Sequence, residues 1–106
     1  MKKTVVLLAL VSGLAHAEFK DGNKLYSEMT GNQYERMASI GYVMGVSDAL
    51  MGITFCGPST ITAGQVYDMI RQYLEMYPAN RHNSGDRIIN QVLKTAWPCA
   101  NQRGTL

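Results

Sequence analysis

The stretch FCGPS at positions 55–59 decides the fold, because it ends a long apolar segment and carries one of the two cysteines. The other cysteine, Cys99, follows Trp97 and Pro98 near the C-terminus. Two cysteines can form a disulfide, contribute to a metal site or supply a nucleophile. The compartment of the protein and the residues available to each sulfur distinguish these three roles.

The N-terminal segment MKKTVVLLALVSGLAHA, residues 1–17, has the pattern of a secretory signal peptide. Two lysines precede a short apolar run and a terminal Ala-His-Ala, which is the order of charge, apolar core and cleavage site in such peptides. The run is shorter than the roughly 20 residues that a membrane-spanning helix needs. We expect cleavage after Ala17 and export to a bacterial periplasm, which leaves residues 18–106 as one domain.

The exported domain is close to electrically neutral. The chain has ten Lys and Arg residues and eight Asp and Glu residues, and two of the lysines lie in the leader, so eight cations remain against eight acids. No basic stripe is available to neutralise nucleic-acid phosphates, and no polybasic patch suits an anionic membrane. We therefore expect neither nucleic acid nor membrane as a partner after cleavage.

A disulfide is the expected role of the two cysteines. Exported small domains are commonly reinforced in this way, and closing a loop of about 44 residues contributes roughly 4 kcal/mol in the chain-entropy model. Two thiols supply only half of a structural zinc site. A catalytic Cys56 would require a histidine, and only His82 lies outside the leader. We predict a Cys56–Cys99 disulfide, and an enzyme with a Cys56–His82 site would instead need free thiols.

Apolar residues at helical spacing predict an all-α bundle of about four helices. No alternating run indicates a strand. The expected helices are a short one over 20–29, a long one over 34–53, a third from the Thr62 cap to Tyr77, and a last one from Asn83 or Ser84 to Trp97. Asn32 is a candidate N-cap for the long helix, and the sequence from Thr62 to Gln65 has the spacing of a capping box.

The long segment YERMASIGYVMGVSDALMGI, residues 34–53, is apolar on most sides, which predicts a central helix surrounded by the others. Small residues recur along it every three or four positions, at Ala38, Gly41, Gly45, Ala49 and Gly52. We expect them to allow close packing within the bundle, rather than a membrane dimer motif. Asp48 is either a hydrogen-bonded carboxylate in the core or at its edge, or part of a surface that faces a partner.

The segment YPANRHNSGDR, residues 77–87, is the most loop-like part of the exported chain, with Arg81 and His82 at its tip. It is either a solvated connector or a probe into the cleft of another molecule. No paired histidines, phosphate-binding loop, serine elbow or metal-ligand cluster is present in the sequence. We therefore expect a binding protein without enzymatic activity, metal or cofactor.

Three segments carry a family resemblance: GYVMGVSDAL (41–50), FCGPSTITAGQVYDMIRQYLEMYP (55–78) and VLKTAWPC (92–99). Together they resemble the periplasmic immunity proteins of type VI secretion amidase effectors, the Tai-like and resistance-associated proteins of Gram-negative bacteria. The resemblance runs from about residue 22 to residue 99. It implies an all-helical, often dimeric protein that binds a peptidoglycan-cleaving amidase, blocks its active-site cleft and protects the producer from its own or a sibling's toxin.

One departure from the pattern concerns cysteine. Many relatives carry a second cysteine pair beside the first loop, where this chain has Met29 and Ser39. Because both cysteines of this pair are missing together, the predicted fold is unaffected. The departure leaves undecided which effector the protein binds. The alternative function is a periplasmic chaperone or stress-related binding protein without a single partner.

The resemblance also implies which residues contact the effector. The loop is the expected cleft-blocking element, with the polar face of the preceding helix in support. The expected partner-binding residues are Tyr77, Asn80, Arg81, His82, Asn83, Ser84 and Asp86, together with Arg71, Gln72 and Glu75. We expect replacement of residues 80–83 by glycine and serine to weaken binding while leaving thermal stability nearly unchanged.

Overall fold

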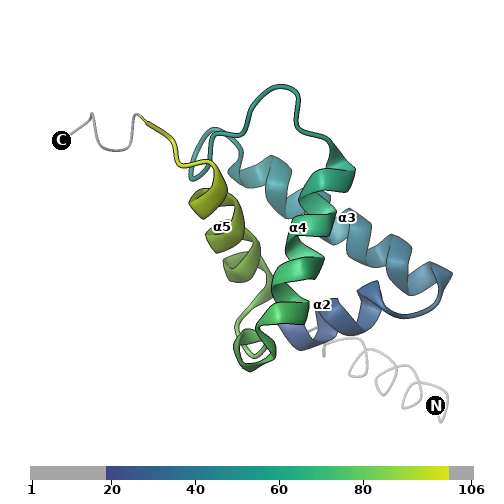
Figure 1. Ribbon diagram of the computed structural model, residues 1–106. Helices are drawn as coiled ribbons and strands as arrows, with labels where there is room; N and C mark the ends of the chain where they lie inside the picture. The colour runs from purple at the N-terminus through teal and green to yellow at the C-terminus, as the bar shows by residue number, and fades with distance from the viewer. Residues whose placement is uncertain (1–18, 101–106) are drawn as a thin grey trace, which may run out of the picture.

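The computed structural model describes residues 19–100 and confirms the all-α prediction. The helices are α2 (Gly22–Met29), α3 (Gln33–Leu50), α4 (Ala63–Met76), the 3₁₀ turn η1 (Pro78–Asn80) and α5 (Gly85–Ala96). Between residues 19 and 100 there is no β-strand, only isolated bridges. The expected leader, its cleavage site and the tail after residue 100 lie outside the described residues. Figure 1 shows α4 and α5 side by side in front of α3, with α2 across one end.

The helix starts follow from local hydrogen bonding. At α3 the Asn32 side chain accepts a hydrogen bond from the Glu35 backbone N–H at 2.9 Å, and the Glu35 carboxylate accepts one from the Asn32 N–H at 2.9 Å. Thr62 and Gln65 make the same reciprocal pair at α4. Both predicted caps are therefore confirmed as capping boxes. Asp21 caps α2 by accepting from the Lys24 N–H at 2.8 Å.

The long helix ends at Leu50, three residues earlier than predicted. Gly52 adopts a φ of +80°, a left-handed conformation that glycine accepts without steric cost. The turn that follows is closed by a 2.7 Å hydrogen bond from the Gly52 N–H to the Phe55 carbonyl. This turn directs the Phe55 ring into the core, where it is fully buried. Full burial of such a side chain contributes about 1.5–3 kcal/mol.

A single hydrophobic core joins all four helices. The amphipathic patterns predicted for α4 and α5 are confirmed, since each helix buries one stripe and exposes the opposite face. The buried core residues are Leu25, Met29, Val43, Phe55, Val66, Ile70, Leu74, Ile88, Ile89 and Leu93. Within the described range, no helix is long and apolar enough to cross a membrane.

The predicted disulfide is confirmed. The sulfurs of Cys56 and Cys99 are bonded, with their Cα atoms 4.8 Å apart. The Cys56 N–H also donates to the Trp97 carbonyl at 2.8 Å, so backbone and side chain both attach the turn after α3 to the end of α5. Because the structure records no free cysteine, a catalytic Cys56 thiol is excluded.

The prediction that the long helix is surrounded is wrong. Only Ser39, Val43 and Ser47 of α3 are buried, while Tyr34 is 81 % and Met37 61 % exposed. The small residues of α3 face solvent rather than another helix of the bundle. The physical reason is that α2, α4 and α5 all pack on the same side of α3, and no further element of the described chain covers the other side. The apolar content of α3 alone does not indicate which of its sides the other helices cover.

Asp48 lies on that uncovered side and is exposed, so it is not a buried carboxylate. It borders a hollow with Ser47, Phe55 and Val66, and its role on a surface that faces a partner stays a prediction.

Met29 and Ser39, the positions at which the resemblance implies a second cysteine pair in relatives, are both buried. The Ser39 hydroxyl donates to the Arg36 carbonyl at 2.6 Å and shares a 2.7 Å hydrogen bond with the Tyr67 hydroxyl. An apolar side chain and a satisfied hydroxyl thus occupy these sites, and neither leaves a buried polar group without a partner.

Candidate functional site

The loop between α4 and α5, residues 77–84, is held in one conformation by the start of α2. The Asn23 N–H donates to the Arg81 carbonyl at 2.9 Å, and the Gly22 N–H donates to the Asn83 carbonyl at 2.9 Å. The Gly85 N–H donates to the Lys20 carbonyl at 2.8 Å. The loop is therefore fixed before any partner arrives, which lowers the ordering entropy that binding would otherwise cost. We call residues 77–84 the α4–α5 loop.

The close contact between the α4–α5 loop and α2 depends on Gly22. A Cβ atom at this position would lie 2.6 Å from the Ile88 side chain and 2.7 Å from the Arg81 carbonyl oxygen. Contacts that short are not tolerated, and one of the two partners is backbone. Glycine is therefore required for the start of α2 to reach the loop.

Arg81 anchors the loop from beneath. Its Nε–H donates to the Leu74 carbonyl at 2.7 Å, and its guanidinium carbon lies 4.0 Å from the centre of the Tyr26 ring. Leu74 is in the last turn of α4, where carbonyl groups lack helical partners and a cation is favourable. The guanidinium therefore makes its contacts with the protein itself. The sequence predicted instead that it would lie at the tip of the loop.

The asparagines of the loop are also engaged internally. The Asn80 amide donates to the Tyr73 hydroxyl at 3.1 Å, and the Asn83 amide donates to the Asn80 carbonyl at 3.1 Å. Because these hydrogen bonds and that of Arg81 lie within the loop or join it to α4, we expect replacement of residues 80–83 to lower thermal stability as well as binding.

The outward surface of the loop is formed by other side chains. His82 is exposed, and its Nδ1 lies 2.8 Å from the Ala79 carbonyl oxygen. Tyr77 is 47 % exposed, and Met76, just before it, is more exposed still. The tip of the loop is therefore an aromatic and apolar surface that carries one imidazole. The guanidinium of Arg81 is not part of this surface.

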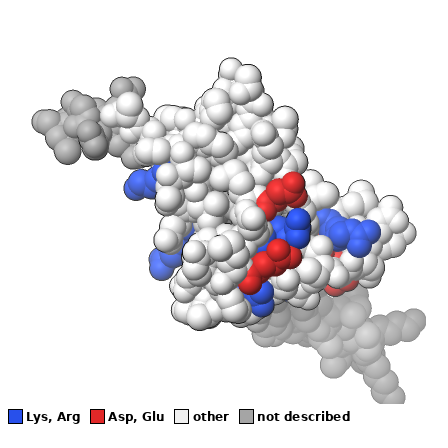
Figure 2. Space-filling view, in the orientation of Figure 1, with Lys and Arg blue, Asp and Glu red and all other residues white. Residues whose placement is uncertain are grey.

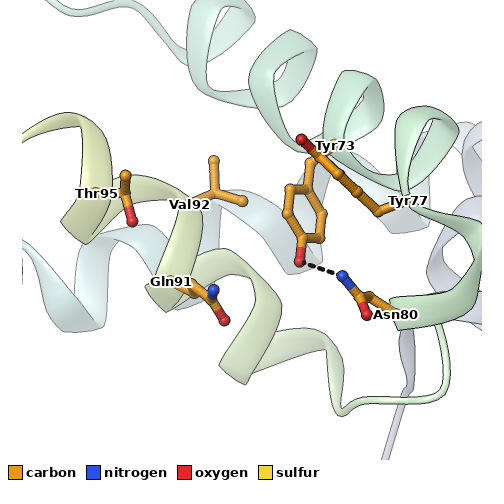
Figure 3. Close-up of a pocket in the computed structure, with 6 residues that line it drawn as sticks. All are labelled: Tyr73, Tyr77, Asn80, Gln91, Val92 and Thr95. Atoms are coloured by element: carbon orange, nitrogen blue, oxygen red, sulfur yellow. Dashed lines mark hydrogen bonds between the residues drawn. The ribbon is translucent and has the colours of Figure 1, made fainter.

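A hollow of about 430 Å³ lies beside the loop, between α4 and α5. Figure 3 shows Tyr73 and Tyr77 on one side and Gln91, Val92 and Thr95 on the other. The centres of the two tyrosine rings are 4.9 Å apart, at 41° to each other. No charged residue lines this hollow, so it suits an uncharged side chain of a partner.

Sequence reasoning missed the α5 side of this hollow. Thr95 lies four positions after Gln91 and three after Val92, so the three side chains share a face of α5. That spacing was visible in the sequence, but nothing in it showed that the face would lie opposite the tyrosines of α4.

The predicted docking face of α4 forms a separate, charged surface. Arg71 pairs with Glu75 at 3.0 Å and with Asp68 at 4.0 Å, and all three side chains are at least partly exposed. Figure 2 shows acidic and basic side chains next to one another over α4, while most of this side of the molecule is uncharged. Such exposed pairs contribute little to stability, so these groups are available to a partner. Gln72 is exposed beside them.

Two further predicted residues lie on the opposite side of α5. Ser84 and Asp86 border another hollow together with Phe19, Tyr42 and Val46. Burial raises the pKa of Tyr42, the charge of Asp86 raises it further, and a backbone hydrogen bond at Asp86 partly offsets both. The ten predicted residues therefore do not form one patch. Six of them belong to the α4–α5 loop, Asp86 lies in the first turn of α5, and Arg71, Gln72 and Glu75 lie on the charged face of α4.

The site has no metal-binding character. Among residues 19–100, no group of three or more His, Cys, Asp or Glu side chains is placed to hold an ion. What the geometry offers is a fixed loop, an uncharged hollow at its base and a charged helix face nearby. These are features of a surface that binds protein.

The comparisons with known proteins agree with this character. No curated protein matches the chain. Residues 21–99 match the family of Rap1a immunity proteins, which suggests a non-catalytic protein. That match contains all four helices, the α4–α5 loop and both cysteines. The chain therefore belongs to the Rap1a family of immunity proteins.

Proposed function

We propose that this protein neutralises a peptidoglycan amidase delivered by type VI secretion, by occluding the active-site cleft of that toxin in the periplasm. Membership of an immunity family implies a cognate toxin as the partner. The amidase and the secretion route rest on the resemblance of residues 41–50, 55–78 and 92–99 to the immunity proteins of such effectors. A homodimer, which the same resemblance implies, belongs to this proposal.

The observation that carries the proposal is the fixed α4–α5 loop. A segment that enters a catalytic cleft must keep its shape, because a flexible loop loses affinity to ordering and offers itself as a substrate. Three backbone hydrogen bonds to residues 20–23 and the Arg81 anchor supply that rigidity here. The loop protrudes at one end of the α4–α5 pair (Figure 1).

The hollow beside the loop supports the same surface. Side chains that dominate binding energy sit in well-packed pockets, and tyrosine is enriched among them. Tyr77 belongs both to the loop and to the hollow, so one partner can fill the hollow while the loop occupies its cleft. The charged face of α4, with Arg71 and Glu75, is separate from this surface. Its charges would influence the rate of association more than the affinity.

The periplasm is supported by the leader pattern of residues 1–17 and by the disulfide. Disulfides persist in oxidising compartments and are rare in a reducing cytosol. A bond between Cys56 and Cys99 fits export of the chain. The chaperone alternative fits less well, because proteins that bind many clients use flexible, re-packing surfaces, whereas this loop is fixed.

The proposal is tested with the product of the neighbouring open reading frame, which it requires to be an amidase-like toxin. Isothermal titration should show binding, and wild-type protein should abolish hydrolysis of purified peptidoglycan. The double substitution Tyr77→Ala with His82→Ala should weaken binding at least tenfold, since it removes the exposed side chains of the tip and leaves the Arg81 anchor in place.

Lys94→Ala is the matched control, because Lys94 is exposed in the last turn of α5, away from the loop. It should bind as wild type does. Equal affinity of the double variant and the control would remove the loop from the interface. Tight binding to a toxin that leaves peptidoglycan intact would keep the immunity role and reject the amidase.

A further inference from the structure

A second hollow lies at the other end of α4 from the α4–α5 loop, between the last turns of α3 and the start of α4. We call it the α3–α4 hollow. Its volume is about 180 Å³, and its apolar lining consists of Met44, Met51, Phe55, Ile61 and Val66. The two methionine side chains are flexible and polarisable, which allows them to adapt to a group that enters the hollow.

The size of the α3–α4 hollow limits what it can hold. Sites for small-molecule ligands and cofactors enclose about 300–1,000 Å³, and this hollow is smaller. It therefore suits one extended side chain of a protein partner. Helix α4 has 14 residues and is about 21 Å long at 1.5 Å per residue, so the hollow and the α4–α5 loop are separate surfaces.

Asp48 supplies the charge of the hollow. It lies four positions after Met44 and three before Met51, on the same side of α3, and it is exposed. None of the ion pairs formed among residues 19–100 involves Asp48. The sequence from residue 37 to residue 70 contains no Lys, Arg or His. On the face drawn in Figure 2, the end of the molecule that carries the segment between α3 and α4 is free of Lys and Arg.

The helix ends beside the hollow leave this charge uncompensated. The C-terminus of α3 carries a partial charge of about −0.5 and the N-terminus of α4 one of about +0.5, so the two offset each other. The N-terminus of α4 is also capped from within, because the Thr62 hydroxyl accepts a hydrogen bond from the Gln65 N–H at 3.1 Å. No basic residue lies in the last turn of α3. The full negative charge of Asp48 therefore sets the sign of the potential at the hollow.

We propose that the α3–α4 hollow binds the side chain of a lysine or arginine presented by a protein partner. Such a side chain packs its aliphatic stem along apolar surface and keeps its charged end near water. The stem lies against Met44 and Met51, and the cation pairs with Asp48. A neutral aliphatic side chain leaves the carboxylate without a partner, and an acidic one is repelled by it, so the hollow discriminates by charge.

The position of Asp48 supports a role in binding rather than in folding. An acidic side chain is unfavourable in the last turn of a helix, and no cation of the described chain offsets that effect. The charge therefore destabilises the free domain and becomes favourable when a partner brings a cation. This proposal uses neither the toxin nor the α4–α5 loop, so it and the proposed function can fail separately.

The binding experiment uses n-butylammonium, which reproduces the side chain of lysine from its first carbon to its ammonium group. The protein is expressed from its full reading frame with ¹³C-labelled methionine methyl groups. Titration should shift the NMR signals of Met44 and Met51, with a dissociation constant on the order of millimolar for so small a ligand. Neutral n-butanol should bind about three- to fivefold more weakly, the ratio that an exposed ion pair supplies, and butyrate more weakly again.

Asp48→Asn should remove the preference for n-butylammonium and leave the binding of n-butanol unchanged. It should also raise the thermal midpoint by about 2–5 °C, because it removes an acid from the last turn of α3 while helix propensity stays nearly the same. Asp68→Asn is the matched control. Asp68 is the other acid between residues 37 and 70, and its carboxylate is exposed outside the hollow. This variant should keep the wild-type preference.

Three results would overturn the inference. Absence of a shift at Met44 and Met51 would show that the hollow does not take the cation. Equal binding of n-butylammonium and n-butanol, or an unchanged preference in Asp48→Asn, would remove Asp48 from recognition. A lower thermal midpoint of Asp48→Asn would make its carboxylate a stabilising group of the fold rather than one that serves a partner.

Discussion

Arg81→Ala is the substitution that most directly tests how the α4–α5 loop is held. It removes a 2.7 Å hydrogen bond to the Leu74 carbonyl and a cation–π contact of 4.0 Å with Tyr26. A hydrogen bond from a charged donor contributes about 1.5 kcal/mol at the lower end of its range, and a partly exposed cation–π contact about 0.5–1 kcal/mol. We expect the free energy of unfolding to fall by about 2 kcal/mol.

For a domain of this size, such a loss lowers the thermal midpoint by roughly 8–16 °C. Denaturant unfolding followed by circular dichroism measures it directly. His82→Ala is the matched control. The neighbouring His82 side chain is exposed, and its hydrogen bond with the Ala79 carbonyl lies at the surface, so its substitution should change the free energy by less than about 0.5 kcal/mol. The loosened loop of Arg81→Ala should also release the effector faster, with association little changed.

The refuting result is an Arg81→Ala protein as stable as the His82→Ala control. It would mean that the guanidinium does not hold the loop and that the backbone hydrogen bonds to residues 20–23 suffice. Arg81→Lys separates charge from geometry, since lysine keeps the cation but lacks the planar fork. It should recover only part of the lost stability.

Three other predictions concern the fold. Replacing both Cys56 and Cys99 by serine opens a loop of 43 residues and should lower the free energy of unfolding by about 4 kcal/mol, measured by denaturant titration beside the wild type. Asn32→Ala removes one half of the capping box of α3 and should cost about 1 kcal/mol in the same assay; no loss would contradict the role of the cap. Because the pKa of Tyr42 is raised above its ordinary value of 10.0, its neutral form is favoured in the folded state. The resulting stability is complete below pH 10 and is lost as the pH rises through the folded pKa; tyrosinate absorbance should show one late-titrating group that is missing in Tyr42→Phe.

Local features of the fold could be predicted because their causes lie within a few residues. The capping boxes at Asn32 and Thr62 join residues three positions apart, and the buried stripes of α4 and α5 repeat with the helical period. The disulfide followed from the number of cysteines and the expected export, without knowledge of any distance.

The loop between α4 and α5 was predicted from its residue types, but the contacts that hold it were not. The residue types of the α4–α5 loop marked it as a protrusion, and the structure confirms an ordered loop there. The function of Arg81 depends on Tyr26, which is 55 positions earlier in the chain, so its neighbours in sequence gave no sign that it was an anchor. The hollow depends in the same way on Gln91 and Thr95 lying opposite Tyr73 and Tyr77.

By itself, the sequence determined the helices, the caps of α3 and α4, the disulfide and the family, because short-range hydrogen bonding, periodicity and cysteine chemistry do not require the rest of the chain. Only the tertiary structure decided which side of α3 is covered and which residues hold the α4–α5 loop. Both depend on contacts between segments distant in sequence, and an apolar pattern is the same whether its second face meets the protein's own core or another molecule.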